Sequence, residues 1–234
     1  MIAGMSGSQK SGLALWWAME MNLATIYISA DMDAFTATVR SAAKATGDHK
    51  DAVMRGLNGS GEGYYREALD DSRIQWCFDS APTVDDVALE LDAYTEAWDR
   101  YPEVVIVDNL MNVEAEHDNE FSGLKMIMSE LHSLARLTGA AVFVLHHMTE
   151  ANQRDTTMPC AKRDILGKVS QLPEVILSVA LDNYRNEMRI AVVKNRNGKC
   201  DPSGRSYMSL QCVPEHGGFQ AWQPAPVGQY GGYE

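Results

Sequence analysis

The sequence has 234 residues, of which 45% are hydrophobic and 22% are charged, and its formal net charge at pH 7 is −12. This length and composition predict one substantial folded domain and exclude global disorder. No apolar run approaches the roughly 18 residues that a membrane-spanning helix needs. The acidic balance argues against nucleic-acid binding over the whole surface, because phosphate contact requires clustered Lys and Arg. Any DNA contact must therefore come from a local basic patch or from metal ions held by carboxylates.

The compartment expected from the sequence is the cytoplasm. No basic region followed by an apolar stretch indicates a signal peptide, and no membrane partner is expected. The four cysteines show no C-x-x-C spacing, which disfavours a disulfide framework or a zinc site.

Short apolar runs alternate with helical periodicities along the chain, a pattern typical of an α/β fold with a mainly parallel twisted sheet and helices on both faces. Runs that are apolar on successive residues predict strands buried on both sides. The predicted strands are 25–29, 74–78, 104–107, 142–145, 175–179 and 189–193, and the predicted helices are 10–21, 34–46, 84–98 and 119–137. We predict a core domain over residues 1–212 and a Gly-, Pro- and aromatic-rich tail over 213–234, poorly ordered from residue 214.

Residues 4–11, Gly-Met-Ser-Gly-Ser-Gln-Lys-Ser, nearly match the phosphate-binding pattern G-x-x-x-x-G-K-[ST]. In that pattern a backbone loop and a helix N-terminus hold phosphates, the Lys meets the outer phosphates, and the hydroxyl holds Mg²⁺. The expected nucleotide-binding residues here are Gly4, Gly7, Gln9, Lys10 and Ser11. Gln9 replaces the second glycine, and its Cβ is expected to crowd the loop. The alternative is an ordinary glycine-rich turn. Only three residues precede the loop, so the first strand is expected to be clipped.

Acidic and histidine side chains follow three of the predicted strands. Asp31, Asp108 and the pair His146–His147 each stand at or just after a strand end. Because parallel strands end at the same edge of a sheet, we expect Lys10, Asp31, Asp108 and His146 to gather there. Asp108 is expected to face Mg²⁺, the alternative being a helix N-cap.

Several connecting segments are expected to be irregular. Residues 58–63 read as a flexible turn, and residues 149–161 as a mobile loop. The acid-rich segment 114–120 is either solvated surface or a second metal-binding region.

The order of these pieces resembles the C-terminal ATPase domain of DnaB-type replicative helicases, within the RecA superfamily, over roughly residues 2–210. Residues 4–11 resemble its Walker A motif and residues 104–108 its Walker B motif. The stretch Ile-Ser-Ala-Asp-Met at 28–32 is similar to the family's S-L-E-M, whose Glu polarises the attacking water; Asp31 stands in that place. His146 stands where the family has a polar sensor, usually Gln.

The segment Lys-Asn-Arg-Asn-Gly at 194–198 is similar to the family's K-x-R-x-G. The resemblance implies that Lys194 and Arg196 reach the γ-phosphate of a neighbouring subunit's nucleotide, as arginine fingers do, and hence a ring, a hexamer or a multiple of it. The alternative is an ordinary basic hairpin. Small RecA/DnaB-like proteins of this kind occur in phages, notably mycobacteriophages, where the type resembles both helicases and RecA-like exonucleases. The compartment is then the cytoplasm of an infected host cell.

The departures from the family fall on the ATPase motifs: Gln9 for Gly, Asp31 for Glu and His146 for Gln, with no N-terminal helical domain in the sequence. They favour a metal-dependent DNA nuclease, exonuclease or structure-specific, with a degenerate ATPase site. In this hypothesis Asp31, Asp108 and His146 are catalytic, and Ser11, Asp31 and Asp108 hold Mg²⁺ or Mn²⁺.

Two alternatives remain open: an ATP-driven ring helicase or translocase of the DnaB type, and a non-catalytic DNA or replisome adaptor. All three take DNA as partner. The basic residues expected to contact it, unless they are simply solvated surface, are Arg154, Lys162, Arg163 and Lys168.

Overall fold

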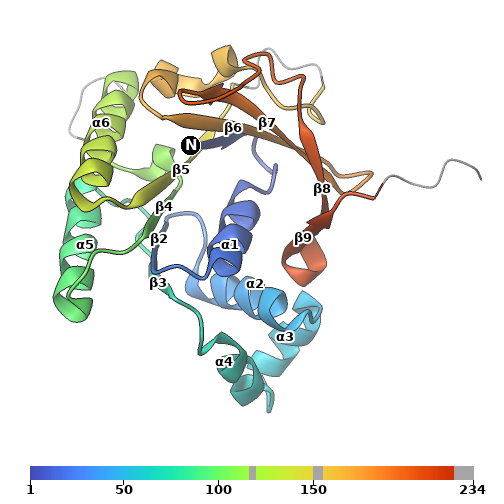
Figure 1. The fold of residues 1–234 in the computed structure, drawn as a ribbon. Coiled ribbons are helices and arrows are strands. Elements are labelled where there is room, and N and C mark those ends of the chain that lie inside the picture. The colour runs from blue at the N-terminus through green and yellow to red at the C-terminus, as the bar shows by residue number, and fades with distance from the viewer. Residues whose placement is uncertain (116–119, 150–154, 224–234) are drawn as a thin grey trace, which may run out of the picture.

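A computed structural model describes residues 1–115, 120–149 and 155–223 of the chain. These residues form a nine-stranded sheet flanked by helices (Figure 1). The strands are β1 (Ile2–Gly4), β2 (Thr25–Ser29), β3 (Ile74–Cys77), β4 (Val104–Asp108), β5 (Ala141–His147), β6 (Val175–Asp182), β7 (Glu187–Asn195), β8 (Met208–Val213) and β9 (Gly218–Ala221). The α-helices are α1 (Lys10–Met21), α2 (Ala34–Thr46), α3 (Lys50–Leu57), α4 (Glu62–Leu69), α5 (Val84–Trp98) and α6 (Glu120–Thr138).

The strand order is β3-β2-β4-β5-β1-β6-β7-β8-β9. The first six strands in this spatial order, from β3 through β1 to β6, are mutually parallel. Strands β7, β8 and β9 extend the sheet in antiparallel pairings. The predicted mainly parallel sheet is confirmed, and β4 pairs in parallel with β5, with Ile106 opposite Phe143. β1 has three residues, and its last one, Gly4, lies between His147 and Val179. The loop after β1 therefore starts in the middle of the sheet.

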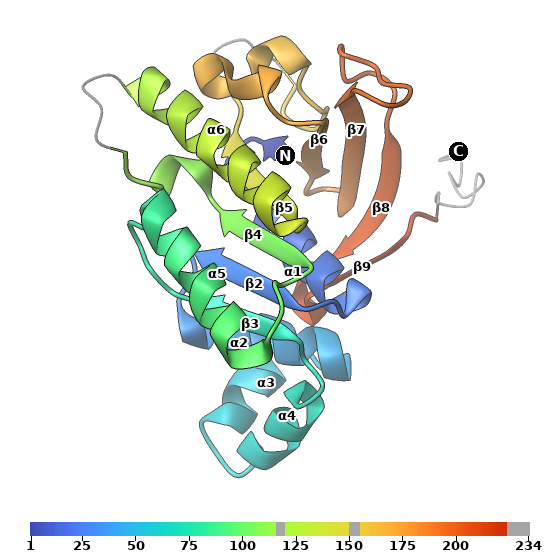
Figure 2. The ribbon, with the colours of Figure 1, turned by 60° about the vertical axis from the view of Figure 1, so that its left-hand side comes forward.

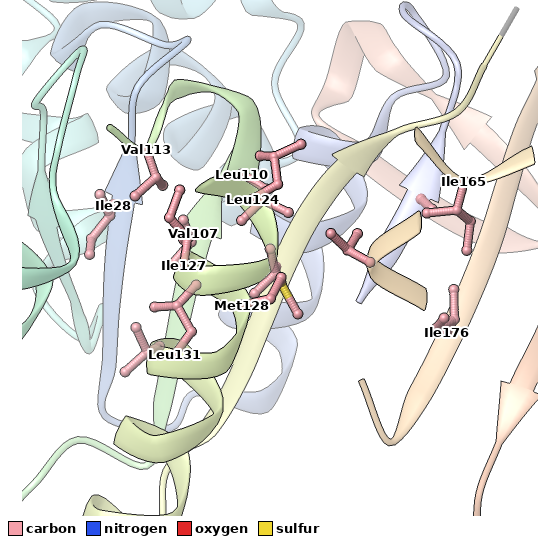
Figure 3. Close-up of a cluster of buried hydrophobic side chains, with 14 of the residues drawn as sticks. Ile28, Val107, Leu110, Val113, Leu124, Ile127, Met128, Leu131, Ile165 and Ile176 are labelled. Atoms are coloured by element: carbon pink, nitrogen blue, oxygen red, sulfur yellow. The ribbon is translucent and has the colours of Figure 1, made fainter. Parts of the chain in front are cut away.

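Each face of the sheet buries its own core, because successive side chains of a strand point to opposite faces. On one face α5 and α6 pack against β2, β4 and β5, and Figure 3 shows Ile127 and Leu131 of α6 in one cluster with Val107 and Ile28. On the other face α1 packs against Tyr27, Ile106 and residues of β7 to β9. Figure 2 shows α5 and α6 in front of the sheet and α1 behind it. Every residue of β2 and β4 is buried, as the apolar runs predict.

Helix ends follow local capping chemistry. Helix α5 begins at a capping box, in which the hydroxyl of Thr83 accepts from the N–H of Asp86 and the Asp86 carboxylate accepts from the N–H of Thr83. Helix α2 is capped at its N-terminus by Asp33, whose carboxylate accepts from the N–H of Thr36 at 2.7 Å, and at its C-terminus by Gly47 in the left-handed conformation. The helices predicted over 10–21, 34–46 and 84–98 are confirmed with these bounds.

Two expectations need correction. The region before β3 contains the short helices α3 and α4, which were not predicted, and the turn expected at 58–63 ends early because α4 starts at Glu62. The segment after Pro214 was expected to be irregular. It instead forms a 3₁₀ turn (Pro214–His216) and β9, whose Phe219 packs edge-on against Trp16 with ring centroids 5.6 Å apart. The sheet therefore extends to residue 221, and residues 224–234 lie outside the described part of the chain.

Arg189 forms a buried ion pair within β7 and also links the antiparallel half of the sheet to the segment after β5. Arg189 and Glu187 are 7% and 4% exposed, and Arg189 Nη2 donates to Glu187 Oε2 at 2.6 Å. Arg189 Nη1 also donates to the carbonyl oxygen of Thr157 at 3.0 Å. The hydrogen bond from Arg189 lowers the pKa of Glu187. Removing Arg189 would leave a carboxylate buried without its cation.

We expect Arg189→Met to lower the free energy of unfolding by about 3–5 kcal/mol, because an unpaired buried charge remains. Urea denaturation followed by circular dichroism measures this. The matched control is Arg66→Met, which removes an exposed ion pair with Glu62 and should cost only about 0.3–0.5 kcal/mol. Equal losses in the two variants would contradict a buried role for Arg189.

Candidate functional site

The loop between β1 and α1 keeps the backbone shape of a phosphate loop. Gly4 has no room for a side chain, since a Cβ would lie 2.6 Å from the carbonyl oxygen of Val179. Gly7 has φ 74° and Gln9 has φ 60°, both in the left-handed region that favours glycine. Gln9 thus carries a side chain on the backbone conformation of the glycine that it replaces.

Lys10 is the first residue of α1, and its ammonium is folded back under the loop. Its Nζ donates to the carbonyl oxygens of Gly4 at 3.1 Å and Met5 at 2.9 Å. Burial lowers the pKa of Lys10, while the negative charges of Asp108 and Asp31 act in the opposite direction. The cation therefore lies close to both carboxylates.

Asp108 ends β4 and is 2% exposed. The hydroxyl of Tyr27 donates to its Oδ2 at 2.8 Å, and the hydroxyl of Ser11 also hydrogen-bonds to the carboxylate. Burial raises the pKa of Asp108 above its usual value, although the bonds from Ser11 and Tyr27 and the charge of Lys10 favour the ionised form. The fold thus holds a desolvated carboxylate beside a hydroxyl and an ammonium.

Asp31 joins this group from the end of β2. Register places Ser29 opposite Asp108, so the two strands end side by side. The amide of Asn109 donates to Asp31 Oδ2 at 2.5 Å. The loop and the strand ends together surround a cavity of about 210 Å³, lined by Ser6, Gly7, Ser8, Gln9, Lys10, Ser11, Gly12, Asp31, Arg40, Asp108, Asn109 and His147.

His147, and not His146, lines this cavity. His146 is fully buried, with its Nε2 at 2.9 Å from the carbonyl oxygen of Leu166, and burial lowers its pKa to about 4. The two histidines point to opposite faces because they are neighbours in a strand. Sequence reasoning also missed Arg40, which reaches the cavity from α2 and whose position depends on how that helix packs. The gathering expected for Lys10, Asp31 and Asp108 is observed, whereas His146 stands apart.

Lys194 and Arg196 lie at the opposite edge of the sheet, near the start of β6, because β7 runs antiparallel to it. Lys194 Nζ donates to the carbonyl oxygens of Ser170 and Gln171 at 2.9 and 2.7 Å. Arg196 pairs with Glu174 at 2.9 Å. Neither residue lines the cavity around Lys10 of its own chain.

A second cavity, of about 670 Å³, is lined by Lys162, Arg163 and Arg205, together with Ala161, Ser170, Pro202 and Ser203. The other two predicted DNA contacts are not placed: Arg154 and the side chain of Lys168 lie outside the described part of the structure, as do residues 116–119 of the acidic segment. Within the described ranges, no group of three or more His, Cys, Asp or Glu side chains is arranged to hold a metal ion.

Comparison with known proteins identifies the family. The chain is 34% identical over 214 residues to the Gene 65 protein of Mycobacterium phage L5, covering 88% of this chain and 80% of that protein. The chain belongs to the family of mycobacteriophage Gene 65 proteins. The Gene 65 protein of Mycobacterium phage D29 is 33% identical over 215 residues, which cover 88% of this chain and 92% of that protein. No protein-family model matches the chain.

Solved structures show which fold this Gene 65 family member adopts. One solved ATPase domain superposes with a TM-score of 0.79 at 19% identity, over 95% of this chain and 84% of that one. A DnaB-like replicative helicase gives 0.79 at 18% identity, over 95% and 58%, and the RadB recombinase gives 0.58 at 16% identity, over 95% and 89%. The predicted RecA/DnaB-type P-loop core is therefore confirmed. In the described parts of the chain, no helix has the length and apolar character to cross a membrane.

The raised pKa of Asp108 gives a test of the site by stability. A folded-state pKa above the unfolded value means that ionisation of Asp108 at neutral pH opposes folding. We expect Asp108→Asn to raise the melting temperature at pH 7, each 1 kcal/mol being worth about 2–4 °C for a chain of this size. The gain should shrink as the pH falls through the raised pKa of Asp108, because the wild-type carboxyl then becomes protonated and loses its buried charge. Thermal unfolding from pH 4 to 8 measures it, and a variant destabilised at pH 7 would contradict this assignment.

Proposed function

We propose that this protein is an ATP-hydrolysing motor core of the DnaB helicase or translocase kind, acting on DNA. The observation that carries the proposal is the meeting of Lys10, Ser11 and Asp108 under a phosphate-type loop at the edge of a parallel sheet. Two structural neighbours, an ATPase domain and a replicative helicase, support the same activity. The phage relatives support a role in the cytoplasm of an infected host cell.

The residues present fit Mg²⁺ and a nucleoside triphosphate. When bound, the pair supplies the phosphoanhydride to be cleaved and a cation that neutralises its oxygens. Lys10 would exchange its bonds to the carbonyl oxygens of Gly4 and Met5 for phosphate oxygens. Ser11 and Asp108 already share a hydrogen bond, which places a hydroxyl and a carboxylate together as metal ligands.

Asp31 would orient the attacking water. Its carboxylate is exposed to the cavity and is held by the Asn109 amide. The shorter side chain, compared with the Glu usual in the resembling family, is thus fixed by a neighbour at the end of the next strand. Arg40 and His147 line the same cavity and would meet the charge that develops on the phosphate.

The nuclease hypothesis favoured by the sequence receives no support. It needs carboxylates and His146 around shared metal ions, yet His146 is buried on the other side of β5. No metal-binding group of three acidic, His or Cys side chains exists among the described residues. The ATPase alternative fits both the site and the fold better, and a non-catalytic adaptor stays as one outcome of the tests below.

A ring assembly is part of the proposal. Lys194 and Arg196 lie at the far edge of the sheet from Lys10 of their own chain. They can serve a nucleotide only in a neighbouring subunit, which is how the resembling family uses them. DNA would be held by a separate basic surface: Lys162, Arg163 and Arg205 line one cavity, giving this acidic protein a local site for phosphate groups.

We expect phosphate release from ATP that requires Mg²⁺, and we expect Lys10→Ala and Asp108→Ala each to reduce it by about a hundredfold or more. The control is Lys125→Ala, which removes an exposed lysine of α6 and should leave the rate unchanged. The same proteins are incubated with end-labelled DNA. Cleavage that survives Lys10→Ala and disappears in Asp108→Ala would restore the nuclease hypothesis. Nucleotide and DNA binding without any turnover would indicate an adaptor.

Mixing two inactive variants tests the ring. Lys10→Ala and Arg196→Ala subunits should each be inactive alone. In an equal mixture, about a quarter of the interfaces would join an intact Arg196 to an intact Lys10, so about a quarter of the wild-type rate should return. Light scattering with Mg²⁺ and ATP should show a hexamer or a multiple of it. A monomer, or a mixture that stays inactive, would contradict action between subunits.

A further inference from the structure

Gln9 poses a steric problem that the structure resolves locally. It immediately precedes Lys10, where the phosphate-binding pattern has glycine, and it lines the same cavity as Lys10 and Ser11. Its φ of 60° and ψ of 30° keep the backbone in the left-handed region. The loop backbone is therefore preserved, and the question is where the added carboxamide goes.

The carboxamide lies against Gly12, the third residue of α1. A Cβ at position 12 would be 2.8 Å from Gln9 Oε1, closer than real side-chain contacts, and 3.9 Å from both Cβ and Cδ of Gln9. Glycine is otherwise unfavourable within a helix, so its presence in the first turn of α1 calls for a local reason. The contact with Gln9 provides that reason, because Gly12 leaves this space to the carboxamide, whereas a Cβ at position 12 would force this flexible group to move elsewhere.

We propose that Gln9 and Gly12 form a matched pair, in which Gly12 seats the Gln9 carboxamide along α1 and thereby keeps the loop open to the phosphate chain of a nucleoside triphosphate. This inference rests on the proposed nucleotide-binding function. The carboxamide is the free end of a flexible side chain, and Gln9 is one of the residues that line the cavity. Displaced from its seat by a side chain at position 12, it enters the space that phosphate needs. Gly12 is thus a positioning residue that acts through Gln9.

Four proteins test the pair: wild type, Gly12→Ala, Gln9→Gly and the double variant. The probe is a fluorescent, non-hydrolysable ATP analogue with Mg²⁺. We expect Gly12→Ala to weaken binding about tenfold or more, the scale of one lost hydrogen bond to a charged group. Gln9→Gly restores the glycine of the pattern and should bind more tightly than wild type. Adding Gly12→Ala to it should cost nothing, because no carboxamide remains to be displaced. Gly63→Ala is the control, since a Cβ there meets nothing within 4 Å.

Two results would overturn the pairing: unchanged binding in Gly12→Ala, or an equal loss from Gly12→Ala in both backgrounds, which would mean that Gly12 contacts the ligand itself. If the wild-type protein binds no nucleotide, the proposed function is wrong. The contact between Gln9 and Gly12 is then tested in the protein without ligand. The side-chain amide signal of Gln9 in a ¹⁵N correlation spectrum should shift in Gly12→Ala and stay in place in Gly63→Ala. A Gln9 signal that does not move in folded Gly12→Ala, with an unfolding temperature at or above that of wild type, would refute the contact.

Discussion

The site depends on a carboxylate that the fold keeps almost free of water. Asp108 is 2% exposed at the end of β4, and desolvation opposes its ionisation. Its charge persists only with partners, and these come from two other elements: Tyr27 from β2, and Ser11 and Lys10 from α1. The parallel pairing of β2 with β4 and the start of α1 beside β1 are therefore both required. A single buried charge thus ties the order of the strands to the chemistry at their shared edge.

The same topology places the charged groups at two opposite ends of the strands. The antiparallel return of β7 carries Lys194 and Arg196 away from the cavity that holds Lys10, to the edge where β6 begins. Their side chains are held there by carbonyl oxygens of Gln171 and Ser170 and, for Arg196, by Glu174. In the proposed ring, this protein with a net charge of −12 would present these fixed cations to the neighbouring subunit. This division accounts for two motifs, the phosphate loop and the basic hairpin, that no single subunit can bring together.

Sequence reasoning located the elements whose signals are local. The bounds of α2 and α5 follow from helical periodicity and from the caps Asp33 and Thr83, and the start of α1 follows from the phosphate-binding pattern before it. It failed where tertiary packing decides. Helices α3 and α4 have eight residues each and bury one side chain apiece, Val53 and Tyr65, so each offers only about two turns in which a helical pattern can be recognised. Strands buried on both faces carry no polar alternation, so nothing in the run before His146 and His147 says which ring faces the cavity. Arg40 lines the cavity because of the way α2 packs against the rest of the fold. Strand β9 is held in place by the packing of Phe219 against Trp16, a contact between residues far apart in the sequence.

A residue that departs from a sequence motif impairs the site only if the geometry of the site changes with it. Gln9 retains the left-handed backbone of the missing glycine, and its side chain lies over a second glycine. Asp31 is one methylene shorter than Glu, yet the Asn109 amide holds its carboxylate at the cavity. His146 does not reach the cavity, but His147 does. Each departure from the motif is accompanied by a second residue that lies near it in space. Sequence comparison scores the two residues separately, or does not score the second one at all. The motif therefore departs from the family at single positions, while the donors, the charges and the cavity of the site remain together. This arrangement favours a site that binds nucleotide over one that has lost its function.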